Sequence, residues 1–251
     1  AKGTPVVNII EKSPEEKISE IIPVKEFSDN EYLVMVTKNG IIKKTPASEY
    51  ESIRKSGKIA ITLKEGDELI SIFKTTGNDN IFLATRNGMA ICFNENDARA
   101  VGRTASGVKA IDLADGDYVV GAEPVREDSK VLLVTDGGYG KCTDLTSFRI
   151  QHRGGKGLKA YKITEKTGNI IGISMVNDSE ELIMVTSEGV VIRIRIKDIA
   201  TTTGRITQGV RLINLDDGVT VVSMDKISAE DAVEEESEEN NTEVTTETTE
   251  E

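Results

Sequence analysis

Arginine recurs at a fixed distance from glycine in this sequence, and it is the residue best suited to chemistry here. Arg103, Arg153 and Arg205 each lie four residues before a glycine, and Arg54 lies three residues before Gly57. The planar guanidinium binds phosphate oxygens in a bidentate way. A neighbouring glycine lets backbone N–H groups approach the same phosphates. The pattern predicts a surface that binds a phosphate backbone.

A second set of cations follows the same glycines. Lys109, Lys159 and Arg211 each lie two residues after one of them. The stretch Gly138–Lys162 carries six basic residues against one acidic residue, Asp144. A DNA duplex presents one phosphate charge per ~1.7 Å of its axis, so a row of cations on a curved rim is a template for bending it. We therefore expect DNA binding through the backbone, without reading of bases.

The predicted DNA contacts are the basic residues of these loops and of the neighbouring strands, with the glycines and polar residues of one glycine-rich loop. They are Lys43, Lys44, Arg54, Lys55, Lys58, Arg99, Arg103, Lys109, Lys141, Arg149, Gln151, His152, Arg153, Gly154, Gly155, Lys156, Gly157, Lys159, Arg193, Arg205 and Arg211.

Other chemistries fit the sequence less well. The cluster Gly154–Gly157 is not the phosphate loop of a nucleotide hydrolase, because no Ser or Thr follows Lys156 and a strand, not a helix, is expected next. His152 is the single histidine and has no Cys or His neighbour that would complete a metal site. No nucleophile elbow and no Cys/His pair is present. We predict no catalytic residue, no metal and no cofactor in this segment.

The elements that must position these cations repeat along the chain. An apolar run with Thr-x-x-Gly at its turn occurs four times, with the threonines at Thr37, Thr85, Thr135 and Thr186. A second, alternating segment opens at Gly3, Gly57, Gly107, Gly157 and Gly209. Alternation of apolar and polar residues is typical of a half-buried strand.

Each repeat thus reads as about four strands without a helix, in about 50 residues, which is typical of a propeller blade. The expected units are residues 32–73, 81–122, 131–176 and 182–224, with a partial unit at 1–27. Since the chain begins in mid-repeat, we expect a first half-blade before Ala1. Equivalent positions on stacked blades form a ring or a spiral of cations. A β-sandwich of unrelated hairpins is the alternative, and it does not explain the fixed spacing.

Charge divides the chain at about residue 227. The formal net charge is −12, and residues 228–251 contain eleven acidic residues and no Lys or Arg, which leaves a net charge of −1 for residues 1–227. A segment of this composition is expected to be disordered. We predict a folded domain over 1–227 and an acidic tail over 228–251. One hypothesis is that the tail competes with DNA for the basic surface, and the alternative is that it only solvates the chain. Under the first hypothesis, deleting the tail should strengthen DNA binding at low salt.

The sequence contains no apolar run near the roughly 20 residues of a membrane helix and no signal peptide. Its two cysteines, Cys92 and Cys142, lie 50 residues apart at the same place in neighbouring repeats. Free thiols are typical of a reducing compartment, so we expect the cytoplasm.

The stretch Gln151–Gly157 closely resembles the Gln-Arg-Arg-Gly-Gly-Arg/Lys-Gly box found in the C-terminal domain of the DNA gyrase A subunit. Residues 1–8, 84–90, 102–108 and 207–212 also resemble that family. The corresponding part of topoisomerase IV belongs to a related family of similar fold.

The resemblance implies an all-β, propeller-like β-pinwheel of about five to six four-stranded blades with strand exchange. Its outer rim would wrap double-stranded DNA in one chiral sense and present a segment to the cleavage core of a bacterial type II topoisomerase. The partners implied are the remainder of the gyrase A subunit, together with the gyrase B subunit, in an A2B2 enzyme. No membrane is involved, and the location implied is the nucleoid-containing cytoplasm. ATP and Mg²⁺ would be used elsewhere in that enzyme.

Two features depart from the family pattern. His152 replaces an arginine of the box, and the matching stretch lies past the middle of the chain. Gln151–Gly157 is therefore interpreted as the equivalent element of a later blade, with the box itself before Ala1. Strands that lose their partner in this way leave a sheet edge exposed. A propeller whose basic rim binds an acidic protein is the alternative function, and an enzyme is disfavoured.

Overall fold

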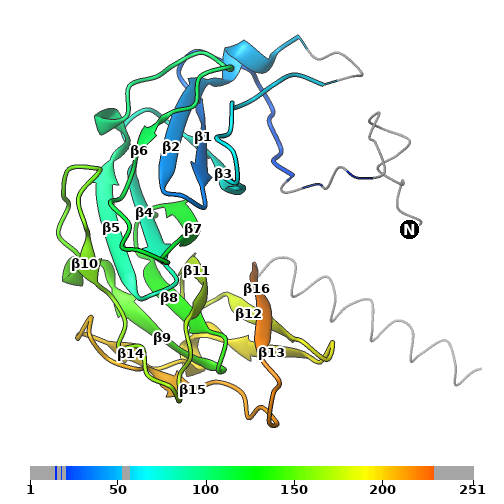
Figure 1. Cartoon of the computed structure of the whole chain (residues 1–251), viewed down its shortest axis with the longest axis vertical. Helices are drawn as coiled ribbons and strands as arrows, with labels where there is room; N and C mark the ends of the chain where they lie inside the picture. Colours follow the sequence, from blue (N-terminus) through cyan, green and yellow to red (C-terminus); the bar gives the residue numbers. More distant parts are fainter. Residues whose placement is uncertain (1–14, 16–17, 19–20, 53–56, 229–251) are drawn as a thin grey trace, which may run out of the picture. The chain divides into compact units, whose positions relative to one another are not determined.

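The computed structural model describes residues 15, 18, 21–52 and 57–228. The chain divides into two compact units, the first made of the residues up to Arg126 with Phe148–Ala160, and the second of Glu127–Ser147 with the residues from Tyr161 onward. Each unit contains two small β-sheets, whose strands are labelled in Figure 1. The predicted strand at 3–10 and the acidic tail beyond residue 228 lie outside the described residues.

Four antiparallel hairpins carry the fold. They are β1 (Tyr32–Thr37) with β2 (Ile41–Pro46), β4 (Asn80–Thr85) with β5 (Met89–Asn94), β8 (Lys130–Thr135) with β9 (Tyr139–Asp144), and β12 (Glu181–Thr186) with β13 (Val191–Arg195).

The Thr-x-x-Gly turn closes every hairpin in the same way. In the first, the amide of Gly40 donates to the carbonyl oxygen of Thr37 at 3.0 Å, and the Thr37 hydroxyl accepts from the amide of Ile41 at 3.2 Å. The same two bonds recur in the other three turns. The turn glycines have φ between 76° and 84°, a region that glycine enters without steric cost.

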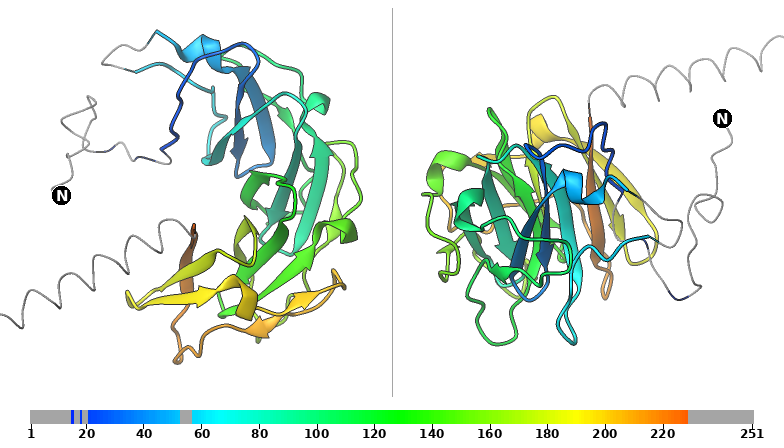
Figure 2. Two further views of the ribbon diagram at one scale, coloured as in Figure 1. Left: turned by 180° about the vertical axis from the view of Figure 1, so that it is seen from behind. Right: turned by 90° about the horizontal axis from the view of Figure 1, so that it is seen from above.

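A third strand pairs with the first strand of each hairpin. These strands are β3 (Leu69–Thr75), β7 (Val119–Pro124), β11 (Ile170–Val176) and β16 (Val221–Ile227). The register shifts at the final threonine of β1, β4 and β12, which places a bulge beside the turn. Figure 2 shows the strands as arrows from two further directions.

The fourth strand of a sheet comes from the repeat that follows it. β6 (Val108–Lys109) pairs with β2, β10 (Leu158–Lys159) with β5, and β15 (Val210–Arg211) with β9. Residues 148–160 belong to the first unit for this reason. The two-residue strand β14 (Thr201–Thr202) also pairs with β9, in parallel. Strand exchange in a propeller-like, all-β fold is thus confirmed.

The number of blades differs from the prediction of five to six. The described residues form four sheets, with strand orders β3-β1-β2-β6, β10-β5-β4-β7, β11-β8-β9-β14 with β15, and β13-β12-β16. In the partial unit expected at 1–27, residues Ile21–Phe27 form no strand, and the strand expected after Gly57 is absent. The segment after Gly57 would pair with the hairpin of a repeat before β1, and the described residues contain no such hairpin.

The last sheet shows what the exchanged strand contributes. Strand β13 has no fourth strand on its outer edge among the described residues. Its residues are exposed or half-buried, whereas β2, β5 and β9 are mostly buried. Val191 at its start is 60% exposed. Strand β13 is therefore a sheet edge among the described residues, and it differs from the edge that the sequence led us to expect at the start of the chain.

Short 3-10 helices follow the second strand of each hairpin, where the sequence predicts irregular structure. They are η2 (Ala47–Tyr50), η3 (Glu95–Asp97), η4 (Leu145–Ser147) and η5 (Ile196–Asp198). Each begins the loop that carries the recurring arginine. Their length is typical of 3-10 turns used as connectors.

The cores lie between the paired sheets of each unit. In the first unit, Val34 and Ile42 from one sheet pack with Leu83 and Phe93 from the other. In the second unit, Leu132 and Cys142 from one sheet pack with Met184 from the other. Among the residues of known placement, no helix is long and apolar enough to cross a membrane.

Candidate nucleic-acid interface

The loops that carry the arginines connect each hairpin to the exchanged strand that follows it. In the first unit, the guanidinium of Arg103 donates from Nη1 to the carbonyl oxygen of Ile59 at 3.2 Å. Arg153 donates in the same manner to the carbonyl oxygen of Lys109 at 2.9 Å. Both acceptors lie two residues after the strand-opening glycine of the preceding repeat. The recurring arginine therefore ties its loop to the preceding repeat.

Most donors of these guanidinium groups are left over. An arginine has five N–H donors. Arg153 uses a second one, Nε, on the carbonyl oxygen of Asp97 at 2.8 Å, and Arg103 lies 3.9 Å from a carboxylate oxygen of Glu49. Both side chains are only half-buried. Each can hold its loop and still present N–H groups to a phosphate.

A backbone hydrogen bond also joins each basic loop to the preceding repeat. The amide of Asp112 donates to the carbonyl oxygen of Gly155 at 2.9 Å, and the amide of Lys162 donates to that of Thr207 at 3.0 Å. The amide of Thr62 donates to Ala105 at 3.4 Å. In each case the donor lies five residues after one strand-opening glycine and the acceptor two residues before the next. Each basic loop is therefore joined, at one register, to the segment that follows the strand-opening glycine of the preceding repeat.

The glycine-rich loop lies against the preceding exchanged strand of its unit. The amide of Gly154 donates to the carbonyl oxygen of Ala110 at 2.6 Å. His152 is exposed and its Nδ1 lies 3.2 Å from a carboxylate oxygen of Asp97. The side-chain nitrogen Nε2 of Gln151 is buried without a hydrogen-bond partner. The loop thus brings Arg153 and Lys156 beside Lys109.

The second cation register is confirmed in its placement. Lys109 lies opposite Ile41, Lys159 opposite Met89, and Arg211 opposite Tyr139.

All three of these cations are exposed, and their local partners differ. The ammonium of Lys109 forms an ion pair with Asp112 at 2.8 Å. Arg211 binds the neutral amide oxygen of Asn214 at 2.8 Å and the hydroxyl of Tyr139 at 3.0 and 3.1 Å. These bonds from Arg211 hold the pKa of Tyr139 below its usual value.

The other predicted contacts differ in exposure. The exposed ones are Arg99, Arg149, His152, Gly155, Lys156 and Arg193, and the half-buried ones are Lys58, Gln151, Gly154, Gly157 and Arg205. Two more, Arg54 and Lys55, lie outside the described residues. The remaining three are buried: Lys43, Lys44 and Lys141.

These three buried lysines were wrongly predicted as DNA contacts. Lys43 is 1% exposed, Lys44 4% and Lys141 0%. Lys44 forms an ion pair with the buried carboxylate of Glu95 at 3.3 Å, and the other two bind loop carbonyl oxygens. An exchanged strand or loop from the next repeat covers each of them, so none is placed to contact a phosphate directly.

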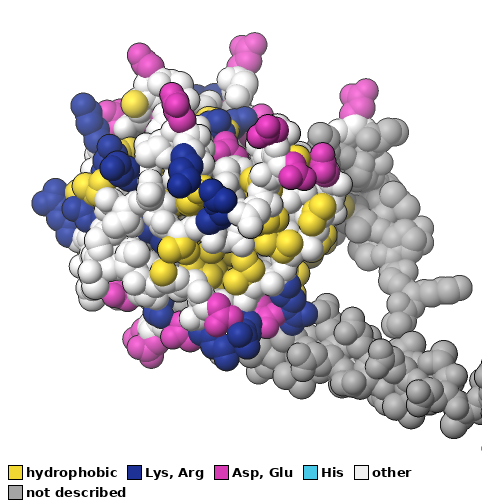
Figure 3. Space-filling view, turned by 90° about the horizontal axis from the view of Figure 1, so that it is seen from below, with side chains coloured by type: hydrophobic (Ala, Val, Ile, Leu, Met, Phe, Trp, Pro, Cys, Tyr) yellow, Lys and Arg dark blue, Asp and Glu magenta, His cyan; other side chains and the backbone are white. Residues whose placement is uncertain are grey.

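Acidic residues lie beside the basic loops, a feature that was not predicted from the sequence. Asp97 accepts from the amide of Arg153 at 3.2 Å. Asp112 neutralises Lys109, and the bond from Lys109 lowers the pKa of its carboxyl group. Asp112 lies five residues after a strand-opening glycine. That fixed spacing could have identified the residue from the sequence. Figure 3 shows the resulting mixture, with Lys and Arg side chains beside Asp and Glu side chains on one face.

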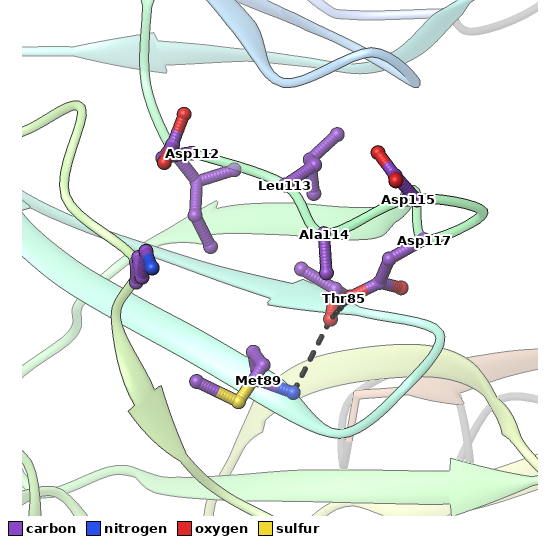
Figure 4. A pocket seen from close by; sticks show the side chains of 9 residues that line it. Thr85, Met89, Asp112, Leu113, Ala114, Asp115 and Asp117 are labelled. Carbon is purple, nitrogen blue, oxygen red and sulfur yellow. Dashed lines mark hydrogen bonds between the residues drawn. The ribbon is translucent and has the colours of Figure 1, made fainter.

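A cavity of about 380 Å³ in the first unit is not a phosphate site. Figure 4 shows Asp112, Asp115 and Asp117 around Thr85 and Met89. Lys156 is the one cation in its lining, and three carboxylates repel a phosphate. Within the described part of the chain, no group of three or more His, Cys, Asp or Glu side chains could hold a metal ion.

Comparison with known proteins points to one family. A family model described as "DNA gyrase C-terminal domain, beta-propeller" matches residues 31–76, 79–126, 129–177 and 180–228, which are the four repeats of the structure.

Similar sequences and a similar solved structure agree with that match. The DNA gyrase A subunit of Halalkalibacterium halodurans is 55% identical over 231 residues, covering 92% of this chain and 28% of the relative. The same subunit of Clostridium acetobutylicum is 49% identical over 232 residues, with 92% and 28% covered. A crystal structure of the C-terminal domain of DNA topoisomerase IV superposes with a TM-score of 0.85 at 30% identity, covering 96% of this chain and 75% of that one.

Proposed function

Since the chain belongs to the DNA gyrase C-terminal domain family, we propose that it binds double-stranded DNA without sequence preference and wraps it. The observation that carries this proposal is the set of backbone bonds that ties each basic loop to the preceding repeat at one register. A duplex following that register meets Lys109, Arg153 and Lys156 in turn, all in the first unit. Repetition of equivalent cations favours contact with the regular phosphate backbone over contact with particular bases.

The chemistry of the loops suits backbone contact. Guanidinium and ammonium groups bind phosphate oxygens, and Gly154 and Gly155 keep side chains away from the approaching backbone. The hydrogen bonds from Arg153 to Asp97 and Lys109 hold its guanidinium before any ligand arrives. Such preorganisation lowers the entropy lost on binding.

The chain spans about 28% of the length of each of the two gyrase A subunits compared above. We infer that it acts as a non-catalytic part of a bacterial type II topoisomerase and delivers wrapped DNA to a cleavage core elsewhere in the enzyme. In that setting its partners are the rest of the gyrase A subunit, together with the gyrase B subunit, in the bacterial cytoplasm. ATP and Mg²⁺ would act in those other parts.

A topological assay tests the proposal. Plasmid is relaxed with a nicking-closing enzyme in the presence of the chain, the protein is removed, and the linking number is measured. A chiral wrapper leaves a shift of one sign that grows with the amount of protein. No shift, together with binding to an acidic protein, would establish the alternative of a protein-interaction propeller.

Salt dependence measures how many phosphates are contacted. If about 5 to 10 phosphates are neutralised, the slope of log K against log salt should be roughly −4 to −9. A slope near zero would rule out an electrostatic wrapping surface.

Releasing Lys109 from its ion pair should strengthen DNA binding. Asp112→Asn removes the carboxylate 2.8 Å from the Lys109 ammonium and keeps the backbone bond from Asp112 to Gly155. An exposed ion pair is weak, so we expect a modest gain in affinity, roughly 1.5- to fivefold at low salt. Fluorescence anisotropy with a labelled duplex measures the change.

Asp115→Asn is the matched control for that variant. Asp115 is exposed and lines the same cavity, so its replacement removes the same charge without releasing Lys109. An equal gain in both variants would show that general charge, and not the release of Lys109, sets the affinity.

A further inference from the structure

Two lysines at the same register are buried where a surface cation was expected. Lys43 and Lys141 each lie three residues after a turn glycine, on β2 and β9. Their exposures are 1% and 0%. A buried ammonium is costly unless its donors are satisfied, so the partners of these two groups show what they hold.

The partners are loop carbonyl groups in both cases. The ammonium of Lys43 donates to the carbonyl oxygens of Arg103 and Ala60. That of Lys141 donates to the carbonyl oxygen of Arg205 at 2.5 Å, to Gly204 at 3.4 Å and to the hydroxyl of Thr207 at 3.1 Å. Each lysine thus binds the backbone of the recurring arginine itself, supplied by the next repeat.

We propose that Lys43 and Lys141 are positioning residues of the DNA interface, whose buried ammonium groups fix the backbone of the loops that present Arg103 and Arg205. This inference rests on the proposed function. The ammonium has three donors, and all the hydrogen bonds described above go to neutral oxygens. The charge therefore acts on the loop backbone and not on a phosphate.

The neighbouring repeat provides an internal comparison. Ile91 occupies the same register on β5, so no ammonium lies beneath the loop that carries Arg153. That loop is held by its own side chain, through the bonds from Arg153 to Asp97 and Lys109. The strand therefore accepts an isoleucine at this position. Equivalent loops are held in two ways, by a buried lysine or by the side chain of the arginine itself.

Protonation should control the two lysine-held loops. Burial, with the nearby guanidinium of Arg103 or Arg205 as a second cause, lowers the pKa of Lys43 and of Lys141 to about 8. The covering loop supplies both causes, so opening it would return each pKa toward the ordinary value of 10.5 and take up a proton. Opening of the loops should therefore become less favourable as the pH rises from about 8 to 10.5.

Other charged and titratable groups face these lysines. Around Lys43 they are Arg103, Arg99, Glu49 and Tyr50, and burial raises the pKa of Tyr50. Around Lys141 they are Arg205 and Tyr161, whose ring lies 5.3 Å from the ammonium and whose hydroxyl pKa is also raised by burial. Arginine stays charged throughout.

Global unfolding should respond to pH in the same direction as loop opening. A lysine pKa that is lower in the folded state means that the unfolded chain binds more protons between about pH 8 and 10.5, the ordinary value for lysine. Stability contributed by this group therefore rises with pH in that window.

Hydrogen exchange of backbone amides tests the proposal without DNA. The amides of Thr62 and Lys162 donate to the carbonyl oxygens of Ala105 and Thr207 in the two lysine-held loops, whereas the amide of Asp112 donates to Gly155 in the third. In Lys43→Ile the protection factor of Thr62 should fall about tenfold, and in Lys141→Ile that of Lys162, since each change removes charged hydrogen bonds. The Asp112 amide should not change.

The wild-type protein provides a second readout that does not depend on folding of a variant. Between pH 7 and pH 9.5 the protection factors of Thr62 and Lys162, corrected for intrinsic exchange, should rise relative to that of Asp112. The double variant Lys43→Ile/Lys141→Ile should not show that rise. Unchanged protection at Thr62 and Lys162 in both experiments would overturn the proposal. Loss of protection in a chain that binds no DNA would instead refute the proposed function alone.

Discussion

Replacing Gly157 with alanine should lower the free energy of unfolding by roughly 2–5 kcal/mol, as measured by urea denaturation. Gly157 opens the exchanged strand β10 with φ 73°, and alanine in the left-handed region costs about 1–2 kcal/mol. A Cβ atom there would also overlap the carbonyl oxygen of Ala90 on β5. Overpacking of this kind costs about 1–3 kcal/mol more.

Gly57→Ala is the control that separates the two contributions. Gly57 has nearly the same φ, 72°, but a Cβ atom there would meet nothing within 4 Å. We expect a loss of only about 1–2 kcal/mol from the backbone conformation. Equal losses in the two variants would show that the close approach of the exchanged strand contributes nothing to stability.

This pair of glycines also shows which features could be predicted from sequence. The fixed spacing predicted that each glycine opens a strand, since a repeated turn residue marks a repeated backbone geometry. Whether the strand forms depends on a partner in another repeat. Gly107, Gly157 and Gly209 have such a partner, and the segment after Gly57 has none among the described residues. Periodicity does not contain that information.

The buried lysines failed as predicted contacts for a related reason. A lysine on an alternating strand is usually exposed, and nothing near Lys43 in the sequence indicates a loop about 60 residues away. The loop that covers it is brought there by strand exchange, because Arg103 precedes the strand that pairs with β2. Recurrence identified the arginine registers correctly, but it could not show that Arg103 and Arg153 also bind backbone carbonyl groups.

The ion pair between Lys44 and Glu95 gives the second large effect. Glu95 is fully buried. Its Oε1 accepts from the amides of Gly77 at 2.9 Å and Asp79 at 2.7 Å, and its Oε2 accepts from the Thr75 hydroxyl at 2.8 Å. The same Oε2 lies 3.3 Å from the Lys44 ammonium. The equivalent contact between the third and fourth repeats is apolar. Cys142 takes the place of Lys44 there and Ile196 that of Glu95, and both belong to one hydrophobic cluster.

Lys44→Met should therefore lower the free energy of unfolding by about 3–5 kcal/mol, because it leaves a buried carboxylate without its cation. Adding Glu95→Gln should restore most of that loss. The glutamine oxygen can still accept from Gly77 and Asp79, and its amide can donate to the Thr75 hydroxyl, so no buried charge remains. Urea denaturation of both single variants and the double variant completes the cycle. If the losses of the two single variants simply add in the double variant, the pair is not coupled and the apolar junction at Cys142 and Ile196 is not its equivalent.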